Sequence, residues 1–453
     1  MTQIIEKYVA NFKEILASFS AGEDLSLDNA EAELTEQIYC LVAGYLGELY
    51  ETKDEEIWSN KAQRKADGLV VERRGDKRQV LTVFGSVNFN RTYYRAVNGY
   101  EYPVDRIAGV EEYRRISNRT GIALVATACS TSYQNSSNLV TGGNVSRQTV
   151  MRAIRQMDVP QVEEAAEKKK VTELHIDADE DHVHLQSGKS VIVPVVCVYE
   201  GKVPVCKGRN RCVNAFHHSE YGDNYDNFWE NVLAEIEARY DISETKVYLH
   251  ADGGNWIQKA QDWIPNIVFV LDDYHKNKAI KKALSGIGRK EAQMYDEVIR
   301  ESFLEDDATL LGEIRDSLIA AFPDRKATIC DGINYLIRFF DAIHLRAANP
   351  KEVPGGSSEP HVQHVLSERL SSTPKAWSEE TLKHFVPVLA ARQAVFACPV
   401  KEVTESDTEK TKKPNLKNTA GLIDPDSVIN FPASAYKQNA LGETLKAFGR
   451  QHF

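Results

Sequence analysis

The chain has 453 residues, of which 42% are hydrophobic and 27% charged, and its formal net charge is −11. This composition is ordinary for a globular protein, the length suggests two to four domains, and the acidity argues against a protein that coats nucleic acid indiscriminately. The longest apolar run, Val191 to Tyr199, is too short to cross a bilayer, and Met1 to Ile15 has no apolar signal core. Seven cysteines without a Cys-x-x-Cys pair fit reduced thiols, so we expect a cytoplasmic protein without structural disulfides.

Residues 1–60 are predicted to be a helical region, because apolar side chains recur there at intervals of three to five positions. Residues 61–115 are predicted to hold a basic β-hairpin that breaks at Gly85-Ser86. From Lys61 to Arg95 there are nine basic and three acidic residues, which leaves a charge of +6. We expect Arg91 and Arg95 of this hairpin to contact DNA; the alternative is a hairpin with solvated surface charges.

Residues 116–160 are predicted to form three short helices, with a Gly-bearing turn before the third. This arrangement resembles a helix-turn-helix whose third helix enters the major groove of DNA. We expect DNA contacts from four polar or basic side chains of that helix: Ser146, Arg147, Gln148 and Arg152. The alternative is a small helical connector with a polar surface. Pro160 and the charged run Glu163 to Lys170 then mark a boundary.

From Val171 onward apolar strands are followed by alternating helices and strands. The predicted strands are Thr172–Asp179, Ser190–Tyr199, Cys212–His217, Lys246–Asp252 and Asn266–Leu271. The predicted helices are Asn224–Tyr240 and Gly254–Asp262. Three strands in a meander, followed by alternating helices and strands, is the order of a ribonuclease H-like α/β domain, and residues 171–275 would be its first part.

Residues 276–350 are helical in pattern and contain no strand candidate, so we predict an all-helical insertion in the α/β domain. Residues 351–400 are predicted to complete that domain with a helix that begins at Glu359, where Pro follows as the first helical residue. Residues 401–453 are predicted to be a linker and tail, disordered over 401–421 for lack of apolar side chains.

Three carboxylates stand at the ends of these elements. Asp179 follows the first strand, Asp252 follows the fourth, and Glu359 opens the last helix. The first and fourth strands are neighbours in this order, so Asp179 and Asp252 would meet. Because close carboxylates are costly in a sheet unless cations neutralise them, we predict a site for two Mg²⁺ ions, for which Mn²⁺ can substitute. Two ions about 3.5 to 4 Å apart would activate a nucleophile and stabilise the leaving oxygen of a phosphodiester.

The assignment of individual acids leaves alternatives. Asp177 and Asp179 point the same way on a continuous strand, so spacing does not decide between them. We favour Asp179 as the ligand, with Asp177 behind it or in its place. Glu359 competes with three other acids on spacing alone, which are Glu368, Glu379 and Glu380.

Further side chains near these acids could take part. Asp272-x-x-His275 follows the fifth strand, where His275 could donate to a phosphate or a leaving oxygen and Asp272 could support it. The basic start of the insertion is expected to lie along the cleaved DNA strand through Lys278, Lys281 and Lys282. One cysteine-histidine group has a spacing that fits no standard zinc module, so we predict no zinc site from it: Cys206, Cys212, His217 and His218.

Together these motifs resemble the DDE transposases of bacterial insertion sequences, and most closely the ISLre-two family. Six stretches carry the resemblance: Thr82 to Tyr94, Val145 to Val150, Asp177 to Val183, Ala251 to Ile257, Leu271 to Lys276 and Glu359 to Val365. The resemblance implies a ribonuclease H-like catalytic domain interrupted by a helical insertion, with Asp179, Asp252 and Glu359 as the metal-binding triad. The Asp-x-x-His element also resembles that of Mutator-type enzymes.

The expected function is therefore a transposase that binds the terminal inverted repeats of its element, hydrolyses a phosphodiester, and joins the freed 3′-hydroxyl to target DNA. The expected partners are double-stranded DNA and further copies of the chain, in a bacterial cytoplasm and at the nucleoid when DNA is bound. The alternatives are a ribonuclease H-like nuclease without strand transfer and a transposase-derived DNA-binding regulator.

Overall fold

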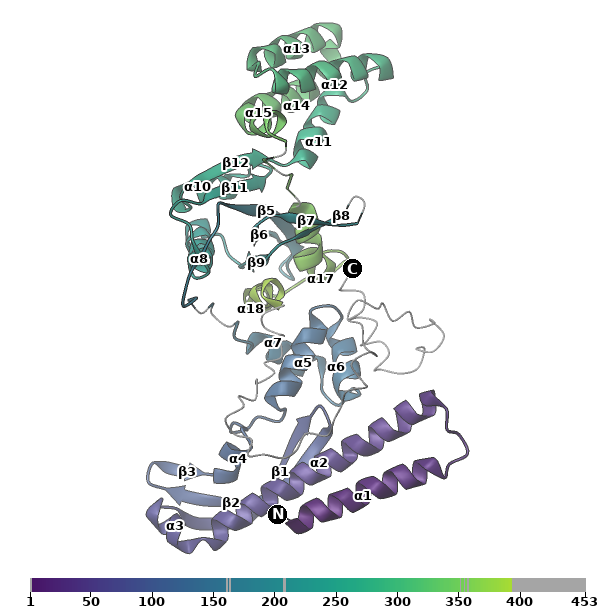
Figure 1. Ribbon diagram of the computed structural model, residues 1–453, viewed down its shortest axis with the longest axis vertical. Helices are drawn as coiled ribbons and strands as arrows, with labels where there is room; N and C mark the ends of the chain where they lie inside the picture. The colour runs from purple at the N-terminus through teal and green to yellow at the C-terminus, as the bar shows by residue number, and fades with distance from the viewer. Residues whose placement is uncertain are drawn as a thin grey trace. The chain divides into compact units, whose positions relative to one another are not determined.

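The computed structural model describes residues 2–159, 162, 164–206, 209–350, 352–353, 355–356 and 358–392, and for Arg209, Ser358 and Glu359 it describes the backbone alone. The described residues form two compact units, one that ends at Met157 and one that begins at Asp158 (Figure 1). Each unit is a mixture of helices and strands. The predicted linker and tail over 401–453 lie outside the described residues. Among the helices described, none is both long and apolar enough to cross a membrane.

The N-terminal unit begins with two long helices, as the apolar spacing predicted: α1 (Thr2–Ser20) and α2 (Leu27–Ser59). After the short α3 (Lys61–Ala66), an antiparallel sheet follows with the order β1 (Val70–Thr82), β2 (Gly85–Ala96) and β3 (Gly99–Glu101). Val80, Val87 and Phe89 of the hairpin pack in a core with Ala43 of α2. The predicted break at Gly85-Ser86 was wrong by two residues, because Thr82 pairs with Gly85 and the turn is Val83-Phe84.

Helix α4 (Pro103–Ile107) leads to the three short helices that the sequence predicted: α5 (Asn118–Ala128), α6 (Tyr133–Thr141) and α7 (Arg147–Arg155). Each of the three starts at a serine whose side chain accepts a backbone N–H, which satisfies a donor at the helix start. Gly142 ends α6 with φ of 60°, a left-handed conformation that glycine adopts without steric cost. Val150 and Ile154 of α7 are fully buried, so the opposite, polar side of this helix is the exposed one.

The second unit is built on a five-stranded sheet with the order β12-β11-β5-β6-β9. Its strands are β5 (Glu173–His184), β6 (Ser190–Tyr199), β9 (Phe216–Ser219), β11 (Lys246–Ala251) and β12 (Ile267–Leu271). Strand β5 is antiparallel to β6 and parallel to β11, β6 is antiparallel to β9, and β11 is parallel to β12.

The predicted third strand, Cys212–His217, is divided in the structure. Strand β8 (Arg209–Cys212) pairs with β7 (Lys202–Cys206) as a separate hairpin, and β9 begins only at Phe216. Asn214 between them has φ of 50°, which a continuous strand does not accommodate. A further short parallel pair joins β4 (Lys169–Lys170) to β10 (Tyr240–Asp241).

The two faces of the large sheet differ in polarity. One face packs Leu174, Ile176 and Leu249 against the helices α8 (Tyr225–Glu237), α9 (Asn255–Gln258) and α10 (Ala260–Trp263). Because side chains alternate along a strand, the residues between these positions point to the other face. That polar face carries buried histidine, cysteine, tyrosine and aspartate side chains, and α16 (Ser358–Val362) packs on it against β5 and β6.

From Asp273 to Ala348 every residue is described and none is in a strand, as predicted for the insertion. Its elements are α11 (Asp273–Leu284), α12 (Arg289–Leu304), α13 (Ala308–Ala321), η1 (Pro323–Arg325), α14 (Lys326–Arg338) and α15 (Phe340–Ala348). They share an apolar core of their own, and in Figure 1 they stand together beyond the β12 edge of the sheet. After α16 come the π-helix η2 (Gln363–Ser367), α17 (Glu368–Leu370) and α18 (Glu379–Ala390).

Candidate active site

Three aspartates on neighbouring parallel strands lie in one row, at the carboxyl ends of β11 and β12 and within β5, which continues to His184, beyond the end predicted at Asp179. Asp177 pairs with His250 between β5 and β11, and the same register continued by two residues sets Asp179 beside Asp252. Ala251 pairs with Leu271, so Asp272 follows next to Asp252 on the other side. The predicted adjacency of the first and fourth strands is confirmed by this pairing.

Local turns fix the orientation of the carboxylates at these strand ends. The Asp252 carboxylate accepts a hydrogen bond from the backbone N–H of Gly254 at 2.9 Å. Asp272 caps α11 and accepts from the N–H of Tyr274, also at 2.9 Å. Asp179 accepts from the N–H of Glu180 at 2.9 Å. Each aspartate therefore has one oxygen held by the backbone, which positions its side chain at the sheet edge.

Asp179 has a strongly perturbed protonation equilibrium. Burial raises its pKa to about 6, and the negative charges of Asp252 and Glu180 add to that shift, while the Glu180 N–H and the nearby His275 act in the opposite direction. Asp179, Asp252 and His275 are therefore close enough to interact electrostatically. A bound cation would relieve the repulsion between the carboxylates of Asp179 and Asp252.

The two aspartates that the sequence could not separate have different surroundings. Asp177 is completely buried: the Tyr199 hydroxyl donates to it at 3.1 Å, and Lys202 Nζ and His361 Nε2 lie 3.9 and 3.7 Å from its other oxygen. Asp179 is only partly buried, within β5 where it pairs with Val195 of β6. The first carboxylate is enclosed by the protein, whereas the second remains accessible to a ligand.

Helix α16 brings the backbone of Glu359 over the sheet, and the side chain of this residue is outside the described part. The approach to α16 is close. A Cβ on Gly356 would lie 2.8 Å from the Cβ of His250 and 3.4 Å from the Asp177 carboxylate, so only glycine fits at this crossing. The glycine at position 356, just before α16, thus has a steric cause.

The helical insertion reaches the aspartate row directly. The Tyr335 hydroxyl of α14 donates to the backbone carbonyl of Asp252 at 2.6 Å. Gly253 has φ of 85°, and a Cβ there would lie 2.3 Å from the Phe339 ring. The sequence analysis missed Tyr335 and Phe339, and nothing local could have revealed them, because the contact closes 83 residues of chain.

His275 lies in the first turn of α11, next to the row. Its ring meets Tyr274 edge-on with centroids 5.1 Å apart. Its Nδ1 atom is buried and has no hydrogen-bond partner among the described residues. A buried ring nitrogen without a partner is costly in a finished structure and is expected where a ligand or substrate completes the site.

The predicted DNA-contacting side chains fall into two groups. On α7, Arg147, Gln148 and Arg152 are exposed, while the Ser146 hydroxyl caps the helix. Of the hairpin pair, Arg95 is exposed beside Glu72, but Arg91 is half-buried, paired with Asp105 and stacked on a tyrosine ring. Hence the positive charge of the hairpin is partly neutralised inside its own unit.

On α11 all three predicted lysines, Lys278, Lys281 and Lys282, are exposed. Lys282 Nζ is 3.2 Å from Asp331 of α14, and Lys278 Nζ lies 5.7 Å from the centroid of the Tyr274 ring.

Comparison with known proteins identifies relatives over most of the chain. Residues 20–404 match the uncharacterised protein family UPF0236. One UPF0236 protein of Caldanaerobacter subterraneus subsp. tengcongensis, whose name joins eleven loci, is 34% identical over 78% of this chain and 74% of the relative. Another from the same organism, whose name joins four loci, is 32% identical over 91% of this chain and 87% of the relative. The chain belongs to the uncharacterised protein family UPF0236.

Proposed function

We propose that this protein is a DDE-type DNA transposase, with a ribonuclease H-like catalytic domain in its second unit. The observation that carries the proposal is the row formed by Asp179 and Asp252 on adjacent parallel strands, with His275 beside it. The strand order β12-β11-β5-β6-β9, with β6 and β9 antiparallel to β5 and the other two strands parallel to it, supports the fold assignment.

The residues present fit a site for divalent cations. Oxygen donors suit Mg²⁺, and the raised pKa of Asp179 comes from burial and from neighbouring negative charge that a cation would offset. Asp179, Asp252 and Glu359 would hold the ions, and Asp177 lies behind them, already engaged by Tyr199. When bound, two Mg²⁺ ions supply charge stabilisation at the attacked phosphate.

The chain's own residues carry the remaining steps. In the first, a water oxygen bonds to the phosphorus at the element end, and the bond from phosphorus to the 3′-oxygen breaks. His275, with its partnerless Nδ1, gives a proton to that leaving oxygen. In the second, the freed 3′-hydroxyl loses its proton and bonds to a target phosphorus, which releases a 3′-hydroxyl of the target.

Recognition of the element ends is assigned to α7. Arg147, Gln148 and Arg152 are exposed on one helix that follows a glycine turn, as in helices that read the major groove. In this proposal Arg91 serves to hold the hairpin together through Asp105 rather than to bind DNA.

The number of loci that encode these relatives supports the proposal that the gene moves within the genome. Names that join eleven, four and two loci of one organism mean that the same protein is encoded repeatedly in that organism. Repetition of this kind is expected when a gene product copies or moves the DNA that encodes it.

The proposal is tested with duplex DNA carrying the inverted repeats that flank the gene. Purified protein should bind these ends, cleave them in Mg²⁺ and join the 3′-ends to a plasmid. Asp252→Asn should bind normally and not cleave, and Asp262→Asn, an exposed acid on α10, is the matched control. Cleavage without joining would favour the nuclease alternative, and binding without cleavage by the wild type would favour the regulator.

A second test addresses recognition. Replacing Arg147 and Arg152 with Ala should weaken binding of the ends by roughly 10- to 100-fold, because each base or phosphate contact contributes on the order of 1 kcal/mol. Arg119→Ala, an exposed arginine of α5, should bind as the wild type does. Equal affinity of the α7 variant and the wild type would move recognition to another element.

A further inference from the structure

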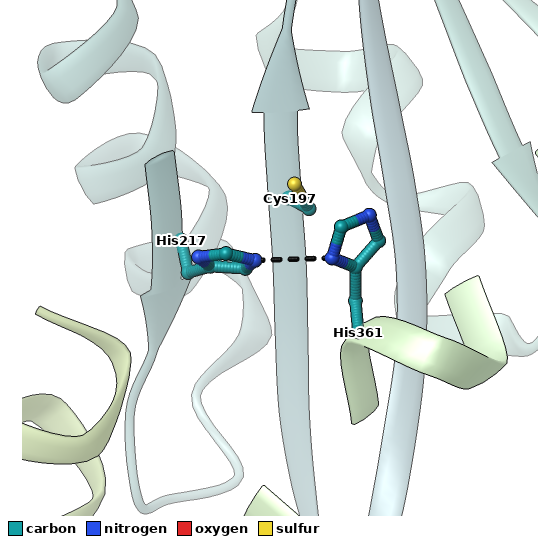
Figure 2. A group of neighbouring side chains, drawn as sticks. All are labelled: Cys197, His217 and His361. Carbon is teal, nitrogen blue, oxygen red and sulfur yellow. Dashed lines mark hydrogen bonds between the residues drawn. The ribbon is translucent and has the colours of Figure 1, made fainter. Parts of the chain in front are cut away.

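A second group of metal-ligating side chains lies on the polar face of the sheet, away from the aspartate row. Cys197 of β6 and His217 of β9 are paired across the two strands, and His361 of α16 reaches over them. One ligating atom from each lies within 4.8 Å of the other two. Figure 2 shows both rings and the Cys197 sulfur converging on the same space, with His217 Nε2 and His361 Nδ1 3.1 Å apart.

The plainest alternative is a pair of neutral imidazoles joined by a hydrogen bond beside a buried thiol. Two features go beyond that. First, the three donors come from β6, β9 and α16 and meet within 4.8 Å of one another, while the Cys212 sulfur lies 3.8 Å from His361 Nε2, the ring nitrogen that faces away from this group. Second, tetrahedral zinc with Zn–N of about 2.0 Å and Zn–S of about 2.3 Å requires ligand atoms roughly 3 to 4 Å apart, and the two ring nitrogens of this group are 3.1 Å apart.

The surroundings of His361 are those of a metal ligand. Its Nε2 atom faces the buried Asp177 carboxylate at 3.7 Å, while Nδ1 faces the centre of the group. Metal-bound histidines generally direct the second ring nitrogen to a carboxylate, which fixes the ring.

We propose that Cys197, His217 and His361 form a zinc site that fastens α16 to β6 and β9. Two nitrogen donors and one sulfur donor select zinc over Mg²⁺, because Mg²⁺ prefers oxygen. The zinc site does not depend on the transposase assignment. Only its functional consequence, that zinc holds the helix bearing Glu359 in place, rests on the proposed function.

Metal analysis of the full-length protein tests the site. Protein purified without an affinity tag or chelator should carry about one zinc per chain. Cys197→Ser and His361→Ala should lose most of it. The matched controls Cys206→Ser and His182→Ala, both at exposed positions, should keep it. Asp177→Asn should bind zinc roughly 10- to 100-fold more weakly, as expected for the loss of a carboxylate behind a ligand.

A spectroscopic measurement covers variants that fail to fold. Adding Co²⁺ to metal-free wild-type protein should produce a thiolate-to-cobalt absorption band with tetrahedral d–d bands, and Zn²⁺ but not Mg²⁺ should abolish both. Wild-type protein without zinc and without a thiolate band would overturn the proposal in favour of a hydrogen-bonded cluster. Neither the zinc content nor the cobalt spectrum depends on DNA. Wild-type protein that binds zinc but does not cleave element ends would therefore contradict the transposase assignment alone.

Discussion

Two groups of ionisable side chains share one face of the large sheet and differ in what they can hold. The aspartate row at β5, β11 and β12 offers oxygen atoms from side chains such as the partly buried Asp179, and burial with like charge raises the pKa of this residue. The group at β6, β9 and α16 offers sulfur and nitrogen atoms around the fully buried Cys197. The type of donor atom and its exposure therefore distinguish a site suited to Mg²⁺ and substrate from a buried site suited to zinc.

Separate substitutions of Asp177 and Asp179 give the strongest test of this difference between the two sites. Asp179→Asn should reduce cleavage of element ends by roughly 10³-fold, as expected for loss of a charge-stabilising group in the active site, and should leave zinc content unchanged. Asp177→Asn should weaken zinc binding first. Cleavage rates and metal content of both variants distinguish the two residues, and the reverse outcome would move the catalytic carboxylate to Asp177.

The lysines of α11 test whether the aspartate row meets DNA. Replacing Lys278, Lys281 and Lys282 with Ala should slow cleavage by about tenfold, because fewer phosphate contacts would hold the strand near the row. The melting temperature should hardly change, since all three side chains are exposed. Replacing Arg289 and Lys290 of α12 is the control. If the α11 variant cleaves as the wild type does, the insertion has only a structural role.

The negative charge of the aspartate row should also affect the free energy of unfolding. The pKa of Asp179 is about 6 in the folded protein, above its ordinary value of 3.8, so this group favours folding at low pH and loses that contribution as pH rises through 6. Without Mg²⁺, Asp179→Asn should therefore stabilise the protein at pH 7.5 by about 1–2 kcal/mol, allowing for partial exposure, and much less at pH 4.5. Denaturant unfolding at both pH values measures this. Destabilisation at pH 7.5 would contradict the assigned repulsion.

The smallest expected effect concerns the support that α14 gives to Asp252. Tyr335→Phe removes one hydrogen bond to a backbone carbonyl, which should cost about 1 kcal/mol of folding free energy and slow cleavage by about fivefold. Tyr295→Phe, a tyrosine of α12 that bonds to Ser317, provides the comparison. Equal cleavage by both variants would show that the carbonyl contact does not position the acid.

Local pattern was enough to predict most elements of the chain. The strands of the large sheet have runs of apolar residues, the three short helices of the first unit start at serines, and the insertion follows a helical spacing throughout. The predictions were wrong where the conformation of a single residue determines the end of a strand or the position of a turn. Asn214 divides a predicted strand by its backbone conformation, and the hairpin turns two residues before the expected glycine position.

The candidate sites show the same limit. Asp179 and Asp252 could be brought together from strand order alone. The Cys197 group could not, because its members come from β6, β9 and α16, and His361 follows His217 by 144 residues. The spacing argument that excluded zinc considered only neighbours in sequence. Cross-strand pairing, which places Cys197 opposite His217, is the signal that could have pointed to the site.

The insertion leaves and rejoins the rest of its unit at nearly one point, since Asp273 at its start forms an ion pair with Arg346 near its end. The distal loops of an insertion joined in this way can lengthen without altering the strand order of the sheet. The loop between α12 and α13, around Asp306, is accordingly a suitable place to graft a fluorescent reporter. In evolution, the same arrangement would let the distal helices of the insertion change while Tyr335 and Phe339 keep their contacts at Asp252 and Gly253.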